Sequence, residues 1–88
     1  MPTTIIPEAE LEIASRFYSA IDVLISRKDI RGLGTLAKRW GLGRFSLTWS
    51  KNHPQDKRIR VVYLYYIARD YNVSLNWLFF GKGDMFEA

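Results

Sequence analysis

The chain has 88 residues, of which 48% are apolar and none is cysteine, so it allows one small core and excludes disulfides and thiolate metal sites. No apolar run approaches the ~18 residues of a membrane helix, and the acidic start is unlike a signal peptide, so we expect a cytoplasmic protein without membrane contact. The net charge is +4, but the charge is unevenly distributed, since residues 27–60 alone carry +8. Such a block of positive charge favours a phosphate backbone as partner, although a solvated basic face has the same composition.

The first predicted helix begins after Pro7 and ends near Arg27. Proline suits a first helical turn, and the glutamates that follow it favour the positive end of the helix dipole. Apolar residues then recur at steps of three and four, which predicts one buried stripe: Leu11, Ala14, Phe17, Tyr18, Ile21, Leu24 and Ile25. The uncharged residues 1–6 are predicted to form a flexible arm, so that a single folded domain spans residues 7–88.

Residues 34–51 predict two short helices joined by a tight turn. The first helix has one apolar face, made by Leu36, Ala37 and Trp40. Thr35 is expected to cap or open this helix, and Gly41 to end it in the left-handed conformation that glycine adopts at least cost. The second helix is predicted over residues 44–51, with Leu47 facing inward. This is the layout of a helix-turn-helix, whose second helix lies in the DNA major groove.

A longer helix is predicted over residues 57–70, and a shorter one, capped by Ser74 and closed by Gly81, over residues 75–80. The longer helix has more apolar side chains than one face can bury. The side chains expected to face inward are those of Val61, Leu64, Tyr65, Ile67 and Ala68. The surplus tyrosines form either a contact surface for a second copy or a wide core. Residues 85–86 are expected to fold back on the body or to reach a partner. The chain shows no sustained strand alternation, so the predicted fold is an all-α, compact five-helix bundle.

The two-helix segment resembles the helix-turn-helix of lambda-repressor-like (XRE-type) regulators, with matching residues at the alanine, turn-glycine and core positions: Ala37, Gly41, Leu42 and Leu47. Arg16-Phe17-Tyr18 resembles the opening helix of that family, and residues 71–86 resemble the ending of many phage-repressor-like domains. The resemblance covers about residues 14–86. It implies a lambda-repressor-like fold and a sequence-specific regulator that binds double-stranded DNA, usually a repressor of phage or mobile-element type. Useful affinity implies a homodimer, formed in solution or only on DNA.

The resemblance also implies which residues contact DNA. Arg44 is the candidate for a guanine contact, Phe45 or Thr48 for a thymine methyl group, and Ser46 and Trp49 complete the base-reading set. Phosphate contacts are expected from Thr35, Lys38, Arg39, Lys51, Lys57 and Arg58.

Trp49 is the ambiguous residue of this set. The family usually has an apolar residue three positions after Leu47, and here that position is Ser50, with Trp49 one residue early. Either Trp49 packs inward on a rotated helix, or it stays on the base-facing side. We favour the buried position, because tryptophan is more often a core residue than a contact.

The alternative function is a helical protein–protein interaction module, of adaptor or antitoxin-like type, whose basic face meets an acidic partner. The surplus of aromatic side chains favours it. An enzyme is not expected, because the chain has one histidine, no credible carboxylate pair and no phosphate-binding glycine loop. His53 has no second ligand near it in sequence, so we expect no metal, and likewise no cofactor and no small-molecule substrate.

Overall fold

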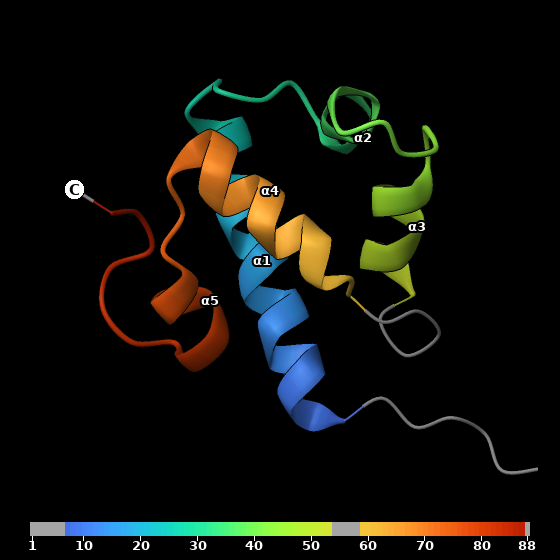
Figure 1. The fold of residues 1–88 in the computed structure, drawn as a ribbon. Helices are drawn as coiled ribbons and strands as arrows, with labels where there is room; N and C mark the ends of the chain where they lie inside the picture. Colours follow the sequence, from blue (N-terminus) through green and yellow to red (C-terminus); the bar gives the residue numbers. More distant parts are fainter. Residues whose placement is uncertain (1–6, 54–58, 88) are drawn as a thin grey trace, which may run out of the picture.

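The computed structural model describes residues 7–53 and 59–87, and over these ranges the chain is all-α, as predicted. The five helices are α1 (Glu8–Ser26), α2 (Leu33–Arg39), α3 (Ser46–Asn52), α4 (Val61–Tyr71) and α5 (Leu75–Phe80). α1 runs through the centre, with α2 and α3 towards one side and α5 on the other (Figure 1). α2 packs on α3, and α5 packs on both α1 and α4. The predicted arm at residues 1–6 lies outside the described residues, as do Lys57 and Arg58.

α1 supplies the largest share of the core. It begins directly after Pro7, as predicted, and carries two glutamates in its first turn. Its buried face holds Phe17, Tyr18, Ala20, Ile21 and Leu24. The predicted stripe is therefore correct in its middle, whereas Leu11, Ala14 and Ile25 at its ends are only partly buried. Burying each large apolar side chain contributes about 2 kcal/mol, so α1 is the element against which the others are held.

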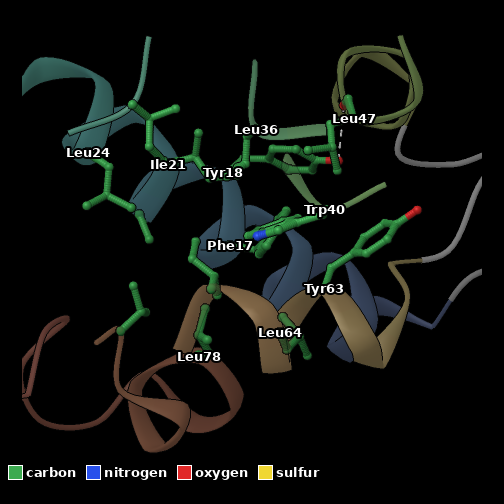
Figure 2. Close-up of a cluster of buried hydrophobic side chains, with 14 of the residues drawn as sticks. Phe17, Tyr18, Ile21, Leu24, Leu36, Trp40, Leu47, Tyr63, Leu64 and Leu78 are labelled. Carbon is green, nitrogen blue, oxygen red and sulfur yellow. Dashed lines mark hydrogen bonds between the residues drawn. The ribbon is translucent and has the colours of Figure 1, made fainter. Parts of the chain in front are cut away.

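Three aromatic rings from three helices meet at the centre of the core. Phe17 of α1 stacks on Tyr63 of α4 with the ring centroids 6.3 Å apart, and lies 6.4 Å from the Trp40 ring at the end of α2. Figure 2 shows these rings side by side, with Tyr18 directed towards α3. The Tyr18 hydroxyl donates a hydrogen bond to the Leu47 carbonyl at 3.2 Å (Figure 2), which ties α3 to α1.

The predicted inward face of α4 is correct at Leu64 and Ile67 and wrong at Val61 and Tyr65. Tyr63, Leu64 and Ile67 are buried, whereas Val61 is 73% exposed and Tyr65 is 56% exposed. The reason is tertiary: Phe17 offers Tyr63 a flat aromatic partner, and Val61 is the first residue of a helix that begins later than predicted. The tyrosines thus contribute both to the core and to the surface.

The end of the chain follows its predicted local signals. The Ser74 hydroxyl accepts a hydrogen bond from the Trp77 amide at 3.2 Å, and Gly81 ends α5 with a left-handed φ of 67°. Residues 85–86 fold back on the body, as predicted, because the Ser74 amide donates to the Met85 carbonyl at 2.8 Å. Val73 and Phe86 form an antiparallel bridge there.

Arg16 holds α5 against α1, a role that the sequence did not indicate. Its guanidinium donates hydrogen bonds to the Leu78 carbonyl at 2.7 Å and the Phe79 carbonyl at 3.0 Å. A cation at the C-terminal end of a helix stabilises the last carbonyl groups and the negative end of the dipole. Arg16 therefore acts within the fold, on the side of α1 that faces away from α3.

Candidate nucleic-acid interface

α2 begins earlier than the sequence predicted. Its first intrahelical hydrogen bond runs from the Leu36 amide to the Gly32 carbonyl at 3.2 Å, so the helix starts at Leu33. Thr35 is consequently the third helical residue and makes no capping hydrogen bond, which corrects its predicted role as N-cap. Leu33 packs against the core and extends the helix by this half-turn. The Thr35 side chain is exposed, and its hydroxyl is not used to cap the helix.

The turn between α2 and α3 has the predicted glycine geometry. Gly41 has a φ of 73°, and the Leu42 amide donates to the Ala37 carbonyl at 2.8 Å. The Ser46 hydroxyl donates to the Gly43 carbonyl at 2.7 Å. The hydroxyl hydrogen of Ser46 is thus used within the turn, and its remaining capacity towards a base is that of an acceptor.

Leu47 and Ser50 are the residues of α3 that face the core. The predicted buried position of Trp49 is therefore wrong. Leu47 is fully buried and Ser50 is 5% exposed, whereas Trp49 is 44% exposed. The rings that fill the centre of the core come from other helices, and the indole finds its partner at the surface: it stacks on His53 with the ring centroids 4.2 Å apart. The buried Ser50 hydroxyl lies beside the Tyr18 hydroxyl, and its interaction lowers the Tyr18 pKa against the larger effect of burial.

The outward face of α3 follows from this register. At 100° per residue, the side chains opposite Leu47 and Ser50 belong to Phe45, Thr48, Trp49 and Asn52. Phe45 is 69% exposed, and Asn52, the last residue of the helix, is exposed too. The sequence interpretation missed Asn52 because it ended the helix at Lys51. An asparagine here has the amide geometry that pairs with adenine.

A basic hollow of about 590 Å³ lies beside this face. It is lined by the segment before α2, by α2 itself and by the turn, through Arg31, Gly32, Gly34, Thr35, Lys38, Leu42 and Arg44. Its three cations, Arg31, Lys38 and Arg44, are exposed, and none of them forms an ion pair with a described residue. Residues 30–55 contain no Asp or Glu at all. The hollow therefore concentrates positive charge that no described acidic side chain neutralises.

The chain matches no protein-family model, no curated protein and no solved structure in the comparisons made. Among residues 7–53 and 59–87, no group of three or more His, Asp or Glu side chains gathers as a metal site would require. No helix of the described part is long and apolar enough to cross a membrane.

The remaining phosphate candidates differ from those in the hollow because they already have acidic partners. Lys51 Nζ lies 3.2 Å from an Asp22 carboxylate oxygen on α1. Arg39 Nε lies 3.9 Å from Asp70 on α4, which also accepts a hydrogen bond from the Trp40 indole at 2.9 Å. Of the predicted phosphate set, Thr35 and Lys38 line the hollow, and Arg39 and Lys51 are paired.

Asp70 is the electrostatic link between α2 and α4. The adjacent Arg69 guanidinium donates to it at 2.7 Å and, with the Trp40 indole and Arg39, lowers the pKa of this carboxyl group. Arg39 also lies over the Tyr71 ring, with its guanidinium carbon 5.5 Å from the ring centroid. These contacts give Arg39 a role in holding α2, in addition to any contact with a partner.

Proposed function

We propose that this protein binds double-stranded DNA through α2, the turn and α3, and acts as a sequence-specific transcriptional regulator of lambda-repressor-like type. The observation that carries the proposal is the hollow lined by Arg31, Lys38 and Arg44, which form no ion pair with a described residue, directly beside an outward helix face that exposes polar and aromatic side chains. Phosphate backbones bind such cations by releasing counterions, and a helix face of this kind fits the major groove.

The mechanism is binding alone. Arg31, Lys38 and Thr35 contact phosphates and set the orientation without reading sequence. On the base-facing side, Arg44 at the turn pairs with guanine and Asn52 at the end of α3 pairs with adenine. Two copies on a pseudo-palindrome, with half-sites about one helical turn apart, give useful affinity, and occupancy of a promoter in the cytoplasm represses transcription.

The experiment is selection of bound sequences from a random duplex pool at near-physiological salt. An enriched pseudo-palindrome is the expected result. Arg44→Ala then relaxes the base preference, whereas Lys38→Ala weakens binding to all sequences alike. Lys82→Ala is the matched control, since Lys82 is exposed and follows α5 in the chain, outside α2, the turn and α3. Recovery of duplex without any motif would reduce the function to non-specific binding.

A second candidate, a protein–protein interaction module of adaptor or antitoxin-like type, is favoured by one specific observation. α5 exposes three large apolar side chains, of Leu75, Phe79 and Phe80, the last of them 70% exposed. Exposed apolar patches of this kind mark protein contacts. Recovery of no duplex in the selection would favour this candidate over DNA binding, and a homodimer formed through α5 would be compatible with both.

A further inference from the structure

The outward face of α3 carries two large aromatic groups in a position where a DNA reader usually places polar ones. Phe45 is 69% exposed and Trp49 is 44% exposed. The Trp49 amide donates to the Phe45 carbonyl at 2.8 Å, so the two residues are one helical turn apart, and their side chains share one face. Apolar surface of this size in contact with water is unfavourable unless a partner covers it.

Trp49 is also held in place before any partner arrives. The His53 ring stacks on the indole with an interplanar angle of 14°, and its Nδ1 donates to the Trp49 carbonyl at 2.9 Å. A side chain ordered in this way loses less conformational entropy on binding than a free one. Phe45 is likewise flanked, since the Arg44 guanidinium carbon lies 5.3 Å from its ring centroid.

The charge around the two rings selects a polyanion as the occupant of this face. Five Lys and Arg residues, and no acidic residue, lie between positions 30 and 55, and three of these cations line the adjacent hollow. An apolar surface surrounded by positive charge fits a partner that is anionic overall but presents apolar groups at the point of contact. In the major groove of duplex DNA, the apolar group is the C5-methyl of thymine.

The spacing of the rings agrees with the spacing of such methyl groups. One helical turn separates Phe45 and Trp49 by about 6 Å along the axis. Base pairs follow one another every ~3.4 Å, so the two rings span about two base-pair steps. We propose that Phe45 and Trp49 are specificity-determining residues that read the 5-methyl groups of pyrimidines in the major groove. This inference rests on the proposed function and names the chemistry that the recognition helix selects.

The test compares duplexes that differ only in the methyl group. The probes are alternating dA-dT duplexes of ~20 base pairs, the same duplexes with uracil in place of thymine, and alternating dG-dC duplexes with and without 5-methylcytosine. Thymine occurs at every base pair of the first probe, so every docking register offers methyl groups. Burial of a methyl group is worth about fourfold in affinity, and the methylated probe of each pair is expected to bind about 4- to 15-fold more tightly.

Variants separate methyl reading from the altered shape of the uracil duplex. Phe45→Ala and Trp49→Ala are each expected to lose part of the methyl preference, and the double variant all of it, while overall duplex binding persists through the cations. Tyr65→Ala is the control, because Tyr65 is an exposed aromatic residue of α4 outside this face. Circular dichroism verifies that each variant is folded, as expected for substitutions at exposed positions.

Two results would overturn the inference while leaving the proposed function intact. One is equal binding of methylated and unmethylated duplexes by the wild type; the other is a preference that the double variant retains. Failure to bind any of the four duplexes at low salt would instead refute DNA binding, and the inference with it.

Discussion

The cations of the hollow should set the salt dependence of DNA binding. The perturbation is the triple substitution Arg31→Gln, Lys38→Gln and Arg44→Gln, which removes the three positive charges that line the hollow. Each phosphate contact contributes about 0.9 to the slope of log K against log salt concentration. Arg31 and Lys38, the two cations assigned to phosphates, therefore contribute a slope of about 1.8, and raising the salt from ~50 to ~200 mM weakens the wild type about 12-fold more than the variant.

The assay is fluorescence anisotropy of a labelled random duplex, titrated at several salt concentrations. The matched control removes the same number of charges elsewhere, through Arg27→Gln, Arg69→Gln and Lys82→Gln. Arg27 and Arg69 already lie beside carboxylates, at 3.6 Å and 2.7 Å respectively. The control should retain most of the wild-type slope. Equal loss of slope in both triple variants would show that net charge alone drives binding, and the docking through the hollow would be refuted.

Three further predictions concern α3 and its attachment. Asp22→Asn releases Lys51 from its 3.2 Å ion pair and should tighten duplex binding. The slope of log K against log salt concentration should become steeper by up to ~0.9. An unchanged slope in the same anisotropy assay would mean that Lys51 does not reach DNA. Ser50→Ala removes a buried hydroxyl that interacts with the Tyr18 hydroxyl and should lower the free energy of unfolding, measured by urea titration, by about 1 kcal/mol; a gain would show that the Ser50 hydroxyl is unsatisfied in the folded state. Burial raises the pKa of Tyr18 from 10.0 to about 12, so its stabilisation is complete below pH 10 and is lost as the pH rises to about 12. Over that range the wild type should lose more of its free energy of unfolding than Tyr18→Phe, in unfolding curves recorded at each pH, and parallel losses would contradict a buried, neutral hydroxyl.

The parts of the fold that the sequence predicts well are those set by local signals. The start of α1 after Pro7 depends on one residue and its neighbours, and so do the Gly41 turn and the Ser74 cap of α5. Turn and cap preferences act over three or four residues and survive in almost any tertiary context. The periodicity of α1 also predicted the middle of its buried face, because apolar side chains at steps of three and four lie on one side of a helix.

The failures concern which face of a helix is buried, which is a non-local property. In α4 the sequence favoured Tyr65 and the structure buries Tyr63, because the deciding partner is Phe17, more than forty positions away. Which charged side chains form ion pairs is also a non-local property that the sequence does not indicate. Lys38 and Lys51 have the same chemistry, yet Lys38 in the hollow forms no ion pair with a described residue, whereas Lys51 pairs with Asp22 of α1. The sequence indicates which cations are candidates for phosphate contacts, but only the fold shows which of them lie beside an acidic side chain.

The register of α3 joins the stability of the domain to its proposed function. Placing Ser50 inward removes a polar hydroxyl from water, and placing Trp49 outward exposes a large ring, so both positions are unfavourable for an isolated domain. α3 is held instead by Leu47, by the Tyr18 hydrogen bond to its backbone and by the Lys51 ion pair. The rotated helix would bury Trp49 and remove its ring from the outward face. The observed register is therefore the one that keeps an aromatic surface available to a partner, at a cost in stability that the contacts from α1 offset.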